Sequence, residues 1–182
     1  MKYFSLDELV DQISETNRSI SRKFLDDNYE LFKKVRGGKS KHQAWEGGYL
    51  DHLMETMNIA VNLYNCLDAL RPLPFSISDS LLVLFLHDID KPWRYAYQDE
   101  KWVEVPQMKT KEQRDAFASS KIAEYNFQLT PEHLNALKYV EGEGNDYHSY
   151  KRIQGHLAAF CHLCDTTSAR IWFDEPKVKG EW

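Results

Sequence analysis

The feature that most constrains the fold is a short apolar run that ends abruptly in charged residues. Residues 78–95 read SDSLLVLFLHDIDKPWRY, and every position of Leu81–Leu86 is apolar. A segment that is apolar on nearly every side predicts a helix at the centre of a core. His87 and Asp88 follow at once, so this helix should end in ionisable groups. Burying such groups is costly unless they are partnered, change their pKa or bind a cation.

The rest of the chain is predicted to be all-α. Ser5 and Glu8 have the spacing of a capping box, and Ser78 is a suitable N-cap for the apolar helix. Thr130 before Pro131 marks another helix start. Residues 95–105 read as a loop or one short hairpin, and Pro92 should prevent simple continuation of the apolar helix. Helical spacing of apolar residues predicts the other helices over residues 6–13, 19–35, 49–70, 111–127 and 153–173, with one more beginning at 131.

Composition restricts the function classes. The net charge is −5 and no basic tract is present, which weighs against broad binding of duplex nucleic acid but allows a local phosphate pocket. The longest apolar run is too short to span a bilayer, and the N-terminal residues show no apolar signal region, so we expect neither membrane insertion nor export. Three cysteines cannot all pair, which favours a reducing, cytoplasmic location.

Two further polar residues interrupt apolar helical stretches in the way expected of metal ligands. His52 lies beside Leu53 in the apolar stripe of residues 49–70, and Asp165 lies in the apolar stretch LAAFCHLCDTTSAR. With His87 and Asp88 they supply two imidazoles and two carboxylates. Mixed nitrogen and oxygen ligation suits one divalent transition metal (Mn, Fe, Co, Ni or Zn) better than Ca or Mg alone.

The C-x-x-C sequence formed by Cys161 and Cys164 has another explanation. No second cysteine pair accompanies it, and both residues lie in an apolar helical stretch. We therefore predict that they are small buried apolar residues and not ligands of a zinc ion. His162 is expected on another face of the helix from Asp165.

The order His52, His87-Asp88, Asp165 resembles the signature of the HD-domain phosphohydrolases, which are all-α metalloenzymes. The flanking sequences are similar as well: GGYLDHLMETM, LFLHDIDKPWRY, LTPEHLNALKY and HLCDTTSAR. The resemblance covers residues 47–170. It implies a single HD domain over residues 1–182, with the N-terminal helices of residues 5–35 packed on that core.

The chain departs from the family pattern at several places. Members with two metals carry extra histidines between the His-Asp pair and the last Asp, where this chain reads RDAFASSK and VEGE. One metal is therefore favoured, and a second ion (Mg or Mn) held by Glu141 or Glu143 is not. Lys91 stands where several single-metal members have a water-activating Glu, and Asp90 stands where lysine-bearing relatives have a small residue.

The resemblance implies a metal-dependent phosphohydrolase that cleaves phosphate ester or anhydride bonds of nucleotides, either as a dNTP triphosphohydrolase or as a 5′-nucleotidase. Asp88 and Lys91 are then the candidate catalytic residues, and Lys91 and Arg94 would neutralise phosphate charge. Trp45 would stack on the base. The other candidates are His42 with Lys39 and Lys41 for outer phosphates, and Arg152, His156 and Lys151 for the far wall.

Two alternatives remain open. One is an HD-type phosphodiesterase that acts on cyclic or oligonucleotides. The other is a catalytically silent HD-fold sensor that binds a nucleotide. The intact metal ligands argue against it, and the departures at Asp90 and Lys91 keep it open. In each case we expect a small-molecule nucleotide as the binding partner, and a homodimer is permitted.

Overall fold

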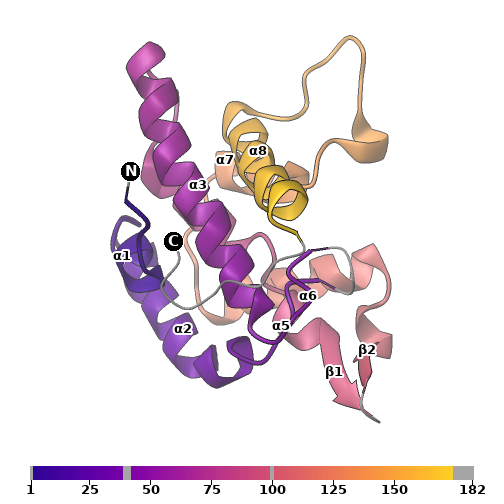
Figure 1. Ribbon diagram of the computed structural model, residues 1–182. Helices are drawn as coiled ribbons and strands as arrows, with labels where there is room; N and C mark the ends of the chain where they lie inside the picture. The colour runs from indigo at the N-terminus through magenta and orange to yellow at the C-terminus, as the bar shows by residue number, and fades with distance from the viewer. Residues whose placement is uncertain (1, 39–41, 99–100, 174–182) are drawn as a thin grey trace.

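A computed structural model describes residues 2–38, 42–98 and 101–173, and it is mostly helical with one small antiparallel sheet (Figure 1). The predicted all-α fold with a short hairpin is confirmed. The elements in chain order are α1 (Leu6–Val10), α2 (Asn17–Phe32), α3 (Gly48–Leu70), α4 (Ile77–Leu86), α5 (Lys91–Arg94), β1 (Tyr95–Gln98), β2 (Lys101–Glu104), η1 (Pro106–Met108), α6 (Lys111–Glu124), α7 (Pro131–Tyr139), η2 (Gly144–Asp146) and α8 (His156–Ile171).

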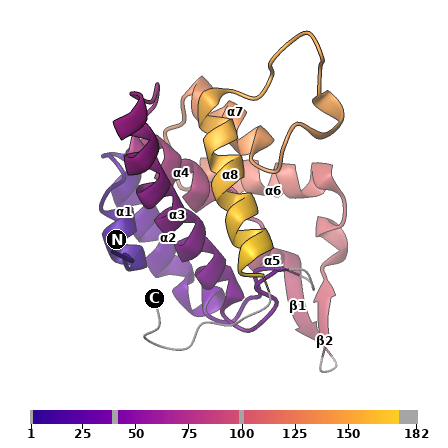
Figure 2. The same cartoon turned by 45° about the horizontal axis from the view of Figure 1, so that its top comes forward.

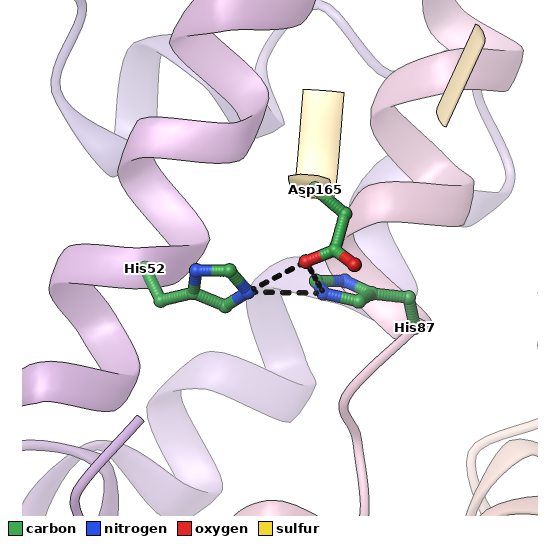
Figure 3. Close-up of side chains that lie close together, drawn as sticks. All are labelled: His52, His87 and Asp165. Atoms are coloured by element: carbon green, nitrogen blue, oxygen red, sulfur yellow. Dashed lines mark hydrogen bonds and ion pairs between the residues drawn. The ribbon is translucent and has the colours of Figure 1, made fainter. Parts of the chain in front are cut away.

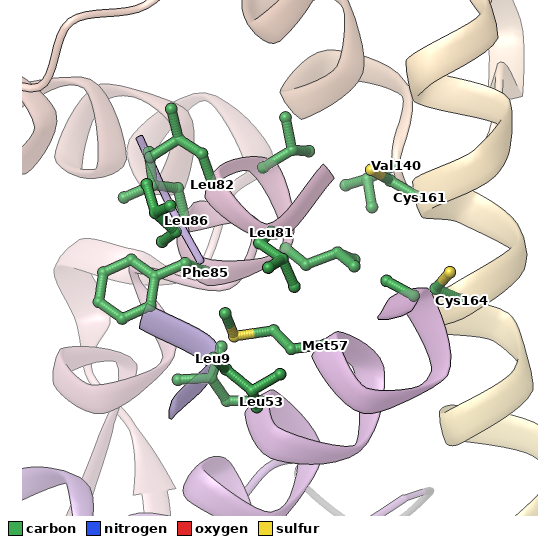
Figure 4. Close-up of a cluster of buried hydrophobic side chains, with 14 of the residues drawn as sticks. Leu9, Leu53, Met57, Leu81, Leu82, Phe85, Leu86, Val140, Cys161 and Cys164 are labelled. Carbon is green, nitrogen blue, oxygen red and sulfur yellow. The ribbon is translucent and has the colours of Figure 1, made fainter. Parts of the chain in front are cut away.

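Helix α4 is the centre of the core, as its sequence predicts. Every residue from Ser80 to Leu86 is buried. Figure 4 shows side chains of α4 packed with those of α3, with Cys161 and Cys164 on the α8 side. Both cysteines are free and fully buried, which confirms their prediction as apolar core residues. Each fully buried large apolar side chain contributes about 1.5–3 kcal/mol, and such burial offsets the cost of a buried polar cluster.

The helices that carry the candidate ligands are neighbours in space. Helices α3 and α8 lie side by side in Figure 2, and both contact α4. The N-terminal helices contribute to the same core through Leu9 of α1 and through Phe24 and Phe32 of α2, which are all 0% exposed. The site therefore rests on one packed set of helices.

Capping residues fix where several helices begin. The predicted capping box of Ser5 and Glu8 is present, and Thr130 caps α7 as expected. The prediction that Ser78 caps α4 is wrong. Ser76 is the N-cap and forms a capping box with Asp79, while the Ser78 hydroxyl accepts a hydrogen bond from the backbone N–H of Ser14 (2.7 Å). The structure thus uses Ser78 to join two segments.

Helix α4 ends at Leu86, and the chain then makes a tight turn. Pro92 lies in the separate short helix α5 and is therefore not what ends α4. The hairpin of β1 and β2 follows and extends from one side of the helices (Figures 1 and 2). Its register places Tyr95 opposite Glu104, so Glu104 reaches Arg94.

Within the described ranges, no helix combines the length and the apolar character that crossing a bilayer requires.

Candidate metal centre

Three ligand-type side chains from three helices meet at one point. His52 comes from α3, His87 caps the C-terminal end of α4, and Asp165 comes from α8. Figure 3 shows their ring nitrogens and carboxylate facing one another. The His52 and His87 Nε2 atoms are 3.3 Å apart, and Asp165 Oδ1 lies 3.1 Å from the first and 3.6 Å from the second. This group has the composition and spacing of a metal-binding site.

Asp88 adds a fourth donor beside the other three. Its Oδ2 atom lies 3.1 Å from His87 Nε2 and 3.4 Å from His52 Nε2, and the Lys91 ammonium is closer still. None of the described residues meets this buried oxygen with hydrogen-bond geometry. A buried carboxylate oxygen that lies between two imidazole nitrogens and pairs with an ammonium is placed where a metal cation could also bind it.

The electrostatics of the cluster are those of tightly coupled charges. Burial would lower the pKa of His87, but the carboxylates of Asp88 and Asp165 raise it well above its usual value. Burial would raise the pKa of Asp165, but the adjacent His52 and His87 imidazoles hold it well below its usual range. A proton on His87 therefore occupies the place that a metal ion would take.

The donor set is of the kind that holds a metal ion. Both imidazoles direct Nε2 to the centre and use Nδ1 elsewhere: His87 Nδ1 donates to the Leu84 carbonyl oxygen (2.7 Å), and His52 Nδ1 is 3.0 Å from Ser168 Oγ. Ligating histidines in metalloproteins have their second nitrogen held in this way. Asp88 and Asp165 supply the carboxylate oxygens of the set.

Lys91 points into the cluster and not to solvent. Its side chain is only 10% exposed and pairs with Asp88 Oδ2. Burial would lower the pKa of Lys91, but Asp88 raises it, so the ammonium stays charged. Asp90 is partly buried nearby, where burial and the Asp88 charge raise its pKa to about 6.

A cavity of about 1070 Å³ opens beside Asp165, whose side chain forms part of its wall. His42, Trp45, Glu141 and Phe173 also line it, and so do His162 and Arg170 of α8. The expectation that His162 and Asp165 lie on different faces is wrong, because residues three apart on a helix lie on the same side. Burial and the Lys91 charge lower the pKa of His42 to about 4, so this cavity wall is neutral at that imidazole.

Several predicted substrate residues lie at or near this cavity. His42 and Trp45 line it, and the Trp45 indole donates a hydrogen bond to Asp51 Oδ2 (2.7 Å), which fixes its orientation. The His42 ring centroid lies 5.0 Å from that of His52. Lys39 and Lys41 lie outside the described residues.

The structure does not bring the other predicted residues to this cavity. Arg94 donates to Glu104 Oε1 (2.7 Å) and lies over the Tyr95 ring, so the hairpin holds its guanidinium. His156 begins α8 and lines a different cavity with Pro74 and Pro131. Asp165 is nine residues further along, about 13 Å away at 1.5 Å per residue. Arg152 and Lys151 are exposed in the loop before α8.

Several residues at the site were not found from the sequence. Arg170 lines the cavity, and among the described residues it has neither an ion pair nor a side-chain hydrogen bond. Gln43, Glu55 and Ser168 form a buried hydrogen-bonded group behind His52. Glu55 carried a usable signal, because it is a charged residue in an apolar stripe and lies three residues after His52, on the same helix face. Gln43 and Ser168 carry no such signal.

Comparison with models of known protein families, with curated proteins and with solved structures finds no match to this chain.

Proposed function

We propose that the protein is a single-metal phosphohydrolase of the HD-domain type that acts on nucleotides. The observation that carries this proposal is the meeting of His52, His87, Asp88 and Asp165, which come from sites far apart in the chain and surround one point in a helical core. The sequence resemblance in the same residues and in their flanks supports the same assignment.

The chemistry of the centre favours phosphoryl substrates. A divalent transition metal, when bound, supplies Lewis acidity that lowers the pKa of water and polarises a phosphoryl oxygen. Two neutral imidazoles and two carboxylates would leave the loaded centre without net charge, and the Lys91 ammonium adds one positive charge beside it. The site would therefore attract an anionic phosphoryl group, and Lys91 is placed to stabilise charge that develops on it.

The adjoining cavity supports a nucleotide as substrate. Its volume of about 1070 Å³ is slightly above the range typical of small-molecule sites, so a nucleotide has room to enter. Trp45 and Phe173 offer aromatic surfaces for a base, and the Arg170 guanidinium offers a phosphate contact. Asp165 belongs to both the cavity wall and the ligand group, so a phosphate in the cavity would reach the centre.

The test is a screen of nucleoside mono- and triphosphates with Mn, Co, Ni, Zn and Mg in turn, with release of phosphate, pyrophosphate and triphosphate measured separately. We expect turnover with at least one transition metal and its loss in His87→Ala. Triphosphate release would assign a triphosphohydrolase, and phosphate release from monophosphates a nucleotidase. His133→Ala is the matched control, because His133 is buried like His87 but bonds Asp79.

The two alternatives give different results in the same screen. Cleavage of only 3′,5′-linked substrates would assign the phosphodiesterase instead. Nucleotide binding without turnover under any metal would assign the silent sensor, whose basis is that Lys91 already pairs with Asp88. The free thiols of Cys66, Cys161 and Cys164 agree with the reducing, cytoplasmic location that we include in the proposal.

A further inference from the structure

A hydrogen-bonded chain of buried side chains runs from Glu55 through Ser168 to His52. Ser168 Oγ donates to Glu55 Oε2 (2.7 Å), and Ser168 Oγ lies 3.0 Å from His52 Nδ1. We propose that Glu55 and Ser168 are positioning residues that fix the tautomer of His52, so that its Nε2 presents a lone pair to the metal. This inference rests on the proposed metal centre and concerns two residues to which the sequence resemblance assigns no role.

Counting hydrogens gives the direction of each bond. A serine hydroxyl has one hydrogen, and a carboxylate oxygen can only accept. Ser168 must therefore use its hydrogen on Glu55, which leaves only lone pairs to face His52. The His52 Nδ1 atom then has to carry the hydrogen in the neutral ring, and its Nε2 atom carries none.

Gln43 holds the carboxylate in place from a third side. Its Nε2 donates to Glu55 Oε2 (2.8 Å) and also lies 3.2 Å from Ser168 Oγ and from the Trp172 carbonyl oxygen. Gln43 and Ser168 are 0% exposed, and Glu55 and His52 are 1% exposed. Water therefore cannot easily reach these groups to replace the bonds, and the orientation of the Ser168 hydroxyl is fixed by protein groups alone.

The tautomer has a direct consequence at the centre. A hydrogen on His52 Nε2 would point at the place where His87 Nε2 and Asp165 Oδ1 converge, and it would have to leave before a metal could bind. The opposite tautomer leaves a lone pair there. Partners of this kind typically change metal affinity by about 10–100-fold when they are removed.

Three variants test the inference. Ser168→Ala removes the acceptor at His52 Nδ1. Glu55→Leu removes the carboxylate, so the Ser168 hydroxyl can turn and donate to that nitrogen. Glu55→Gln keeps an oxygen that can accept from Ser168. Ser80→Ala is the matched control, since Ser80 is a serine that is also 0% exposed but bonds the Ser76 carbonyl oxygen.

The first readout is the tautomer of His52, observed by nitrogen-15 NMR of the imidazole in metal-free protein at a pH where the ring is neutral. We expect the Nδ1–H form in the wild type, in Glu55→Gln and in Ser80→Ala. We expect a shift towards the Nε2–H form in Ser168→Ala and in Glu55→Leu. An unchanged His52 tautomer in Ser168→Ala would overturn the inference, and so would a wild-type Nε2–H form.

The second readout is zinc affinity, measured by competition with a chelator. Ser168→Ala and Glu55→Leu should each weaken it by about 10–100-fold. The double variant should lose no more than either single variant, because the two residues act in series on one nitrogen. Fully additive losses would indicate independent packing effects and contradict the inference. If wild-type protein bound no metal, the proposed function would fail, whereas the tautomer result would still be readable.

Discussion

At the scale of single residues, Lys91 would compete with a bound metal for the same carboxylate. Its ammonium pairs with Asp88 Oδ2, the carboxylate oxygen that also faces the Nε2 atoms of His52 and His87. A metal ion and Lys91 would share this carboxylate and repel each other. The residue should therefore oppose metal binding and favour the reaction of an anionic substrate, and these two effects can be separated.

Lys91→Met should bind metal at least as tightly as the wild type but turn over about 100-fold more slowly, because the variant loses the positive charge near the phosphoryl group. Zinc competition gives the affinity, and initial rates at saturating nucleotide give the turnover. Lys138→Met is the control, since Lys138 is an exposed lysine that pairs with Asp146. Weaker metal binding in Lys91→Met would show that Lys91 mainly supports the ligand geometry.

The raised pKa of His87 predicts a pH dependence of metal binding. A metal has to displace the His87 proton, so affinity should rise by up to about tenfold per pH unit and level off above that raised pKa. Chelator competition across pH measures this slope. His133→Ala should keep it, and a flat profile below neutral pH would contradict the protonated state of His87.

The same pKa shifts set the stability of the metal-free protein. The contribution of His87 is fully present below its unfolded pKa, about 6.5, and is lost as pH rises through its raised folded pKa. The contribution of Asp165 is present above its unfolded pKa, about 3.9, and is lost as pH falls towards its depressed folded pKa. Urea unfolding of metal-free protein should show maximal stability between the two unfolded pKa values, about 3.9 for Asp165 and about 6.5 for His87. Greatest stability at alkaline pH would contradict this account.

At the scale of elements, the sequence predicted the features that depend on residues close together in the chain. Periodicity located the helices, and the polar interruptions at His52 and Asp165 located candidate ligands. The sequence did not show which serine, Ser76 or Ser78, is the N-cap of α4, because both can cap a helix. In the structure Ser76 is the cap and Ser78 contacts Ser14 instead. Arg94 was predicted to bind phosphate through its guanidinium. The sequence could not show that Glu104 binds it instead, because that contact depends on the register of the hairpin.

The start of α3 is another element that depends on close approach. A Cβ on Gly48 would lie 2.0 Å from the Gln43 carbonyl oxygen, so only glycine allows the loop to pack here. Gln43 in turn holds Glu55, which links this contact to the metal centre. The sequence shows the Gly47-Gly48 pair but does not show that the loop residue Gln43 packs against Gly48.

Gly48→Ala should lower the free energy of unfolding by about 1–3 kcal/mol and also weaken zinc binding, since the Gln43 backbone must move. Chemical denaturation and chelator competition measure the two effects. Gly144→Ala is the control: Gly144 has φ +53° and open space around it, so that change should cost about 1–2 kcal/mol of backbone strain without affecting zinc affinity. Equal zinc affinities in Gly48→Ala and wild type would contradict the proposed link.

At the scale of the whole molecule, the site is a product of helix packing. The ligands meet because α3, α4 and α8 share one core, and the cavity forms where α8 faces the loop that carries His42 and Trp45. No local pattern reports such a meeting, so Arg170 and Ser168 could not be assigned from the sequence. His156 shows that a shared helix does not place two residues at one site, since it lies on the same helix as Asp165 but at the other end.

Because the metal would tie three helices together, its removal should destabilise the whole fold. A transition metal at about 100 times its dissociation constant should add about 2.7 kcal/mol of stability and raise the melting temperature by about 5–10 °C. Thermal unfolding with and without a chelator measures this shift. Asp165→Ala should show almost none of it, and an equal shift in that variant would place the ion elsewhere.

The most direct measurement for the central claim is the metal content of purified protein after loading and desalting, determined by elemental analysis together with protein concentration. The account predicts one transition-metal ion per chain in the wild type and in His133→Ala, and close to none in His52→Ala and His87→Ala. A wild type that retains no metal under any loading condition, or a His52→Ala variant that retains a full equivalent, would contradict it.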